Sequence, residues 1–371
     1  MRLVAAFFAP LWLASAAWAT APVGELQSGS HSHGISRSVQ QEFESRLRTA
    51  QRYISEDRAA EAEALLQEIL KDNPDSLQAN DLLGSVLLQH RQFEEAEKHF
   101  ESALRVNRHD EPARQGERDA AVGLALKLRK AGDGPAALLS LEHAETFLPD
   151  DPILLTDLGI EADSLHQYDR AAEVLDAVLK EKPEDPTALY ALARTELDRD
   201  NPGKAEMLFH AYLAQRPDDA SAHYGLGRLF QMQQRSGEAS AEFRCSLDIQ
   251  PSQTESYYQL GQMALDAHRD TEARAMFEKT LGRLPTHGGA RTGIGILDYR
   301  AKEYKLARGS LEEAIASSPD YQAAHYYLGL TLGRLGDKEA STRELQVAAQ
   351  LAAEQQGKGK PIGVVSPDVH R

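Results

Sequence analysis

The chain has 371 residues, of which 42% are hydrophobic and 26% are charged, so its composition is that of a globular protein. Its 57 acidic and 41 basic residues give a net charge of -16, which repels a phosphate backbone and argues against a nucleic-acid partner. Cys245 is the single cysteine, which excludes an intramolecular disulfide and a zinc cage built from cysteines.

Residues 1–19 have the pattern of a signal peptide. Arg2 gives a short positive start, residues 3–18 are apolar and rich in alanine, and Ala17-Trp18-Ala19 has the small-x-small form that signal peptidases accept. We therefore expect an exported protein that begins at Thr20 and is periplasmic or secreted. An uncleaved N-terminal membrane anchor is the alternative, although the apolar stretch is short for a membrane span.

Residues 20–42 contain glycine, serine and histidine without a clear period, which predicts a flexible linker. His31 and His33 lie two residues apart in this segment, but no third ligand is near them in the sequence. We interpret them as solvated side chains, and the sequence predicts no metal site.

A period of 34 residues dominates the rest of the chain. Prolines, small residues and alanines all follow it, in one common phase: Pro149, Pro183, Pro217, Pro251, Pro285 and Pro319; Gly159, Ala193, Gly227, Gly261, Gly295 and Gly329; Ala171, Ala205, Ala239, Ala273 and Ala307. Three residue classes with one period indicate an array of repeated structural units.

Each unit has the pattern of two short helices joined by a tight turn. In the unit from 220 to 253, Gly227 lies on the first helix, where the lack of a side chain permits close approach of a neighbour. Ala239 and Phe243 share one face of the second helix, and Pro251 ends that helix. Stacked hairpins of this kind bury their apolar sides against one another.

These positions resemble the tetratricopeptide repeat family. The residues that carry the resemblance are Leu83, Gly84, Ala96, Phe100 and Ala103 in one unit and Leu226, Gly227, Phe230, Ala239, Phe243 and Pro251 in another. The resemblance implies an all-α fold, an α-solenoid superhelix of about nine tandem helix-turn-helix hairpins, over residues 43–355. We expect the units to start near residues 43, 77, 118, 152, 186, 220, 254, 288 and 322.

The period is interrupted once. Pro74 and Pro149 are 75 residues apart, which is two periods plus seven residues. Asp110 and Pro112 predict the start of a helix that continues through Arg129 and is longer than its counterparts. We expect a local change in the curvature of the superhelix there.

The sequence contains none of the common catalytic motifs, neither a GxxxxGK phosphate loop, nor an HExxH zinc helix, nor a GxSxG nucleophile elbow. It therefore predicts no catalytic residue and no cofactor. Residues 356–371 are rich in glycine, lysine and proline, which indicates a disordered tail.

Two histidines and the cysteine have simple interpretations. His223 and His325 fall at one repeat position, where a contact within the hairpin is a better explanation than an isolated base or ligand. Cys245 follows Phe243 on a second helix, and we expect a buried, inert thiol there.

The candidate binding residues form a ladder. Tyr190, Tyr224, Tyr258 and Tyr326 are separated by multiples of 34, and Arg194 and Arg228 follow two of them by one helical turn. The resemblance implies that these first helices line the inner surface of the superhelix. Tyrosine and arginine are common anchors of protein partners. Packing between hairpins is the competing explanation for the tyrosines, and both remain open at this point.

The sequence thus predicts a non-enzymatic scaffold or adaptor that binds a protein or peptide partner in a concave groove, with an acidic exterior that favours basic partners. It predicts no nucleic-acid partner and no stable membrane span after cleavage. One alternative is an accessory protein of exported polysaccharide synthesis or secretion, since aromatic side chains also stack on sugars. An enzyme with an unrecognised site is the least favoured alternative.

Overall fold

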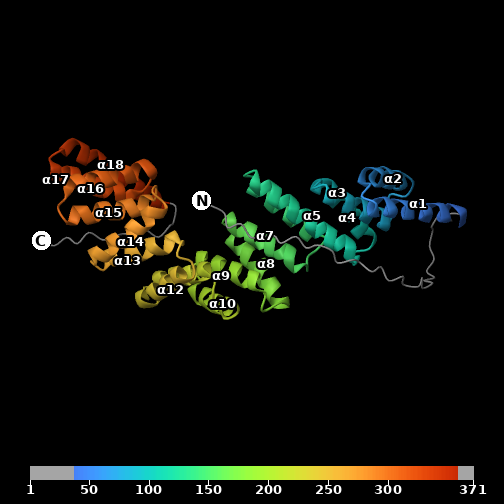
Figure 1. Cartoon of the computed structure of the whole chain (residues 1–371), viewed down its shortest axis with the longest axis horizontal. Helices are drawn as coiled ribbons and strands as arrows, with labels where there is room; N and C mark the ends of the chain where they lie inside the picture. The colour runs from blue at the N-terminus through green and yellow to red at the C-terminus, as the bar shows by residue number, and fades with distance from the viewer. Residues whose placement is uncertain (1–36, 358–371) are drawn as a thin grey trace.

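The computed structural model describes residues 37–357, which form eighteen α-helices arranged as nine consecutive hairpins, with no strand among these residues. We number the hairpins as units 1 to 9. The first helices of the units are α1 (Arg37–Ser55), α3 (Leu77–Gln89), α5 (Glu111–Lys130), α7 (Pro152–Ser164), α9 (Pro186–Asp198), α11 (Ala220–Met232), α13 (Thr254–Asp266), α15 (Gly288–Arg300) and α17 (Gln322–Leu335). The second helices are α2 (Ala59–Asp72), α4 (Phe93–Val106), α6 (Gly134–Glu145), α8 (Tyr168–Glu181), α10 (Pro202–Gln215), α12 (Ser236–Ile249), α14 (Asp270–Arg283), α16 (Tyr304–Ser317) and α18 (Lys338–Gly357). The hairpins follow one another in an elongated solenoid with α1 at one end and α18 at the other (Figure 1).

Both ends of the array differ slightly from the sequence-based boundaries. Helix α1 begins at Arg37, so residues 37–42 are helical and do not belong to the predicted linker. The predicted signal peptide, the remainder of the linker and residues 358–371 of the predicted tail lie outside the described residues. No helix within residues 37–357 is long and apolar enough to cross a membrane.

The irregular unit is unit 3, and its predicted start near Arg118 is wrong. Helix α5 begins at Glu111, and the Asp110 carboxylate caps it by accepting a hydrogen bond from the Ala113 N–H at 3.2 Å. Position 111 keeps the 34-residue phase of Leu77, the first residue of α3. The seven extra residues therefore lengthen α5 by about two turns toward its C-terminus, and the phase of the repeat changes within this helix.

The helix ends follow the proline and aspartate pattern. Each of Pro183, Pro217, Pro251, Pro285 and Pro319 comes directly after the C-cap residue of a second helix. The next first helix then begins with a cap, as at Asp185, whose carboxylate accepts from the N–H groups of Thr187 and Ala188, both at 3.0 Å. Proline stops the helix because it cannot donate a backbone hydrogen bond.

The turn inside each hairpin depends on one residue in the left-handed backbone conformation. Seven of these residues are not glycine: Asp57, Arg91, His166, Asp200, Gln234, His268 and Lys302. Gly132 and Gly336 take the same role in units 3 and 9. An L side chain is strained at positive φ, so seven hairpins carry a small destabilising contribution at the turn.

Glycines and phenylalanines hold neighbouring units together. The ring of Phe277 on α14 lies between Gly261 on α13 and Gly293 on α15, and a Cβ atom at either glycine would lie less than 3.0 Å from the ring. Phe100 lies in the same way between Gly84 and Gly116. The close approach predicted from the Gly227 and Phe243 positions is therefore confirmed across several units.

Candidate functional site

The first helices form the inner side of the solenoid. Helices α3 and α5, α5 and α7, α7 and α9, α13 and α15, and α15 and α17 contact one another across consecutive units. No two second helices within residues 37–357 pack together to a comparable extent. In a curved stack the elements on the concave side lie closer together, so the first helices line the concave surface.

The tyrosine ladder lies on these first helices. Tyr190, Tyr224, Tyr258 and Tyr326 are each the fifth residue of a first helix, and all four side chains are half-buried. The rings of the first three pack against a phenylalanine of the second helix in the same hairpin, with centroid distances of 6.3, 5.8 and 6.2 Å to Phe209, Phe243 and Phe277 respectively. Packing therefore accounts for part of each ring, and the remaining part is accessible.

Tyr326 has a different environment from the other three. Unit 9 has Leu345 where the other ladder units have phenylalanine, and the Tyr326 ring instead meets the Tyr327 ring edge-on at 5.3 Å. The contact between tyrosine and phenylalanine therefore repeats over units 5 to 7, and at unit 9 a contact between two tyrosines replaces it.

The two predicted arginines are linked by an acidic side chain. Arg228 donates to the Tyr224 hydroxyl at 3.4 Å, whereas Arg194 lies 3.7 Å from a carboxylate oxygen of Asp163 in the preceding unit. Burial and the nearby Asp163 raise the pKa of Asp198, while the positive charges of both arginines oppose the rise. The structure thus brings both arginines near Asp198, and it joins only Arg228 directly to a ladder tyrosine.

A polar cluster that the sequence did not predict borders Tyr258. The His287 ring lies 4.5 Å from the Tyr258 ring, and the Tyr258 hydroxyl is 3.3 Å from that of Tyr321. The Nδ1 atom of His287 accepts from a backbone N–H, so its Nε2 atom carries the proton that faces Glu255 at 3.5 Å and lowers the pKa of that carboxyl. The Oε1 atom of Gln262 is buried without a hydrogen-bond partner.

A sequence signal for this cluster existed in the cap positions. The residues before successive first helices change from aspartate to other types at the 34-residue spacing: Asp151, Asp185, Asp219, Gln253, His287 and Tyr321. Units 7 to 9 therefore replace acidic caps by an amide, an imidazole and a phenol on the edge of the ladder.

The two repeated histidines make contacts within their hairpins, as predicted. His223 contacts the Glu242 carboxylate at 2.6 Å and the carbonyl oxygen of Pro217 at 3.0 Å. His325 makes the equivalent contacts with Glu344 and the carbonyl of Pro319. Both histidines tie the first helix to the second helix of the same unit.

The prediction of a buried thiol at Cys245 is wrong, because the side chain is exposed. Phe243 faces the core, and a residue two positions later on a helix points in nearly the opposite direction. Partial desolvation and the carboxylates of Glu242 and Asp248 raise the pKa of the thiol.

Units 2 and 3 contain buried carboxyl groups. Glu117 on α5 is fully buried and neither of its carboxylate oxygens has a hydrogen-bond partner. Burial and the nearby Glu97 raise its pKa to about 9, so it is neutral at pH 7. Burial likewise raises the pKa of Glu97 and of Asp81 to about 7. No set of three His, Cys, Asp or Glu side chains within residues 37–357 is arranged to hold a metal ion.

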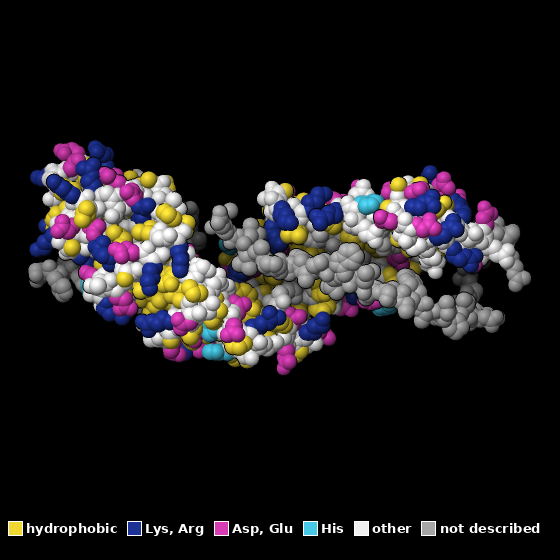
Figure 2. Space-filling view, in the orientation of Figure 1, with side chains coloured by type: hydrophobic (Ala, Val, Ile, Leu, Met, Phe, Trp, Pro, Cys, Tyr) yellow, Lys and Arg dark blue, Asp and Glu magenta, His cyan; other side chains and the backbone are white. Residues whose placement is uncertain are grey.

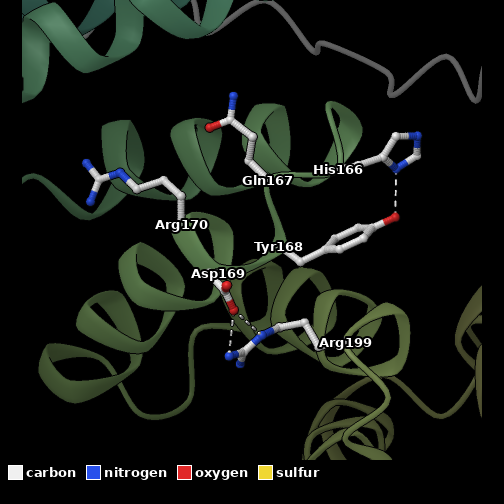
Figure 3. A pocket seen from close by; sticks show the side chains of 6 residues that line it. All are labelled: His166, Gln167, Tyr168, Asp169, Arg170 and Arg199. Atoms are coloured by element: carbon white, nitrogen blue, oxygen red, sulfur yellow. Dashed lines mark hydrogen bonds and ion pairs between the residues drawn. The ribbon is translucent and has the colours of Figure 1, made fainter. Parts of the chain in front are cut away.

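A hollow of about 530 Å³ lies at the turn of unit 4 (Figure 3). His166 contacts the Tyr168 hydroxyl at 2.6 Å, and Arg199 donates to Asp169 at 3.1 Å, while Arg170 points away on the other side. These pairings within the hollow stabilise the hairpin turn, and they leave no free nucleophile beside a base.

The comparisons with known proteins define the class of the chain. Two tetratricopeptide repeat models match it, one over residues 53–116 and 164–223 and the other over residues 292–356. Together these segments make up about half of the chain, which belongs to the tetratricopeptide repeat family. No curated protein sequence matches it.

One solved structure shares the fold over most of the chain. The crystal structure of the APC/C hetero-tetramer Cut9-Hcn1 contains a chain that is 13% identical, with a TM-score of 0.54 over 80% of this chain and 57% of that chain. The structure titled MamA RS-1 ArsTM double mutant is 16% identical and covers 46% of this chain and 97% of its own, with a TM-score of 0.40. YrrB, described as a TPR protein with an unusual peptide-binding site, is 20% identical over 50% of this chain and 95% of its own, with a TM-score of 0.40. The fold and the family together are those of a protein–protein interaction scaffold.

Proposed function

We propose that this scaffold binds a segment of a partner polypeptide along the concave side of units 5 to 9. The observation that carries the proposal is the row of half-buried tyrosines at one position of successive first helices. Each of the first three rings is held by a phenylalanine behind it, so little conformational entropy is lost when the accessible part meets a partner.

Polar groups beside the ladder fit a peptide backbone. Arg228 already bonds to Tyr224, and the exposed Arg194 lies one turn beyond Tyr190, 3.7 Å from Asp163. Aromatic area with directional donors and acceptors is the combination that anchors peptides in grooves. Among the described residues around the ladder, no nucleophile lies beside a base. We therefore propose a role in binding and not in catalysis.

The test is affinity capture with the full chain as bait. We expect a protein partner that is retained by the wild-type chain and lost when the four ladder tyrosines are changed to alanine. Because those changes also remove packing, a second variant, Arg194→Glu with Arg228→Glu, reverses two charges without touching the core. The matched control is Leu139→Ala with Met207→Ala, which removes exposed apolar side chains from second helices.

Retention of the partner by both ladder variants contradicts the proposal, and so does an equal loss of the partner in the control. Retention of glycans on an array by a chain that captures no protein favours the polysaccharide-related alternative instead. Circular dichroism of each variant establishes that the helices are intact.

We further propose that the chain is exported after cleavage behind Ala19. The support is the pattern of residues 1–19, with its positive start, apolar centre and small-x-small end. N-terminal sequencing of the protein recovered from cells is expected to give Thr20 as the first residue. A mature protein that retains Met1 favours the uncleaved anchor.

A further inference from the structure

The segments around the hairpin turns of units 8 and 9 carry a local excess of positive charge in an acidic chain. Residues 299–310 and 332–343 contain seven cationic and three acidic side chains, although the whole chain has a net charge of -16. We call this surface the C-terminal basic edge, and its cations are Arg300, Lys302, Lys305, Arg308, Arg334, Lys338 and Arg343. Figure 2 shows Lys and Arg side chains gathered over the end of the array where α17 and α18 lie.

The two hairpin turns that supply these residues form one surface. The Tyr299 and Tyr304 rings, at the end of α15 and the start of α16, lie 5.6 Å apart. Arg334, near the end of α17, lies close to the Tyr299 hydroxyl and to Tyr304. A cation of unit 9 therefore lies beside a pair of aromatic rings of unit 8.

The positive charge is left over from a pattern of ion pairs between units. Arg199 pairs with Asp169 of the preceding unit, and Arg300 pairs with Asp270 in the same way, each at 2.9 Å. One unit further on, the corresponding residues are Arg334 and Tyr304, so this arginine has an aromatic neighbour in place of a carboxylate. Lys302, Lys305 and Lys338 are also exposed and, within residues 37–357, form no ion pair.

Apolar side chains complete the surface. Leu306 is 61% exposed and Leu335 is 38% exposed, and both lie among the cations in the sequence of the two turns. Unpaired lysines near exposed leucine and half-buried tyrosine side chains complement a segment that combines carboxylates with apolar residues.

We propose that the C-terminal basic edge binds an acidic segment of the partner polypeptide that occupies the tyrosine ladder. The inference rests on the proposed function, because Tyr299 and Arg334 lie on first helices and so continue the concave surface beyond Tyr258 and Tyr326. At physiological ionic strength the Debye length is about 8 Å, so the distant carboxylates of the chain are screened and the local cations determine the contact.

The experiment measures the binding of a fluorescein-labelled peptide that alternates glutamate with leucine and serine to the full chain, by fluorescence anisotropy. The test variant is Lys302→Glu, Lys305→Glu and Lys338→Glu. The matched control is Lys71→Glu, Lys180→Glu and Lys182→Glu, which changes the net charge equally at exposed lysines far from units 8 and 9. We expect the test variant to bind about tenfold more weakly than the wild type, and the control to stay within about twofold of it.

Equal weakening in the two triple variants indicates non-specific charge attraction and overturns the inference, as does equal binding of a peptide with glutamine in place of glutamate. Preferential binding of phosphatidylcholine vesicles that contain phosphatidylserine, lost only in the test variant, assigns the edge to a lipid surface and also overturns it. If the acidic peptide fails to bind while the captured partner still depends on the ladder tyrosines, the inference fails and the proposed function stands.

Discussion

Units 1 to 4 and units 5 to 9 share one backbone repeat but place different side chains on their first helices. The ladder position holds tyrosine in four of the last five units, whereas in units 2 and 4 the same position holds Asp81 and Thr156. The buried apolar residues from Leu47 to Leu192 form one continuous cluster, whereas the remainder divide into three smaller clusters. The first region is joined mainly by aliphatic packing, and the second presents an aromatic surface.

The difference shows that the repeat constrains the seams between helices and leaves other positions free. Glycine beside a phenylalanine ring occurs in both regions, at Phe100 and at Phe277. Away from these seams, units 2 and 3 bury carboxyl groups, and Glu117 is the most deeply buried of them. At the position of Glu117, units 2 and 4 to 9 have leucine or isoleucine: Leu83, Leu158, Leu192, Leu226, Leu260, Ile294 and Leu328.

The largest effect is expected when Glu117 is changed to leucine, which makes unit 3 resemble the other units. Since the folded pKa of about 9 lies above the ordinary value of 4.5, the contribution of Glu117 to stability is greatest below pH 4.5 and is lost as the pH rises toward 9. Removal of this group is expected to stabilise units 2 and 3 by about 3 kcal/mol at pH 7. Amide hydrogen exchange of α4 to α6 measures the change.

The gain from Glu117→Leu should grow between pH 5 and pH 9, by up to about 1.4 kcal/mol per unit of pH. Glu111→Gln on the same helix is the control, because Glu111 is exposed. A gain that does not depend on pH contradicts the account of a buried neutral carboxyl.

A smaller effect of the opposite sign is expected for Gly293→Ala, which disturbs the aromatic seam of the second region. The added Cβ would lie less than 3.0 Å from the Phe277 ring, so the units must shift apart. We expect a loss of about 2 kcal/mol in the stability of α13 to α15, measured by hydrogen exchange. Gly309→Ala is the control, since nothing lies within 4 Å of its added Cβ and alanine favours the helix by up to about 1 kcal/mol. Stabilisation by Gly293→Ala is the contradicting result.

The smallest effect tests a feature that both regions share, the strained residue of the hairpin turn. Gln234 has a φ of 60°, whereas Gly132 has a φ of 85° without strain. We expect Gln234→Gly to stabilise unit 6 by about 0.5 kcal/mol and Gly132→Ala to destabilise unit 3 by about 1 kcal/mol. Urea unfolding, monitored by circular dichroism, measures both changes in the free energy of unfolding. A change in the same direction for the two variants contradicts the explanation by strain at positive φ.

The sequence predicted the fold because packing residues recur at one interval. Gly227, Phe243 and Pro251 each have one physical role that their residue type reveals, so the hairpins could be located from them. The start of unit 3 was predicted wrongly because α5 begins one period after α3, whereas the end of the unit lies in the phase of α7. The prolines follow only the phase of α7.

The candidate site was predicted only in part. Tyr190, Tyr224 and Tyr258 could be found because they obey the period. The cluster of Glu255, Gln262, His287 and Tyr321 could not be predicted, since its members come from three consecutive units. Only the cap residues His287 and Tyr321 occupy equivalent positions of the repeat. The contact of Arg334 with Tyr299 likewise depends on the packing of neighbouring hairpins and not on spacing within one.

The most direct test of the central claim is a photo-crosslinking measurement in the cell of origin. A benzophenone amino acid replaces Arg194 on the concave side of α9 in one full-length chain and the exposed Met207 on α10 in another. A partner polypeptide that crosslinks at position 194 but not at position 207, and that is lost with Tyr224→Ala, is the predicted result. Crosslinking of the same partner at position 207 alone contradicts binding on the concave side.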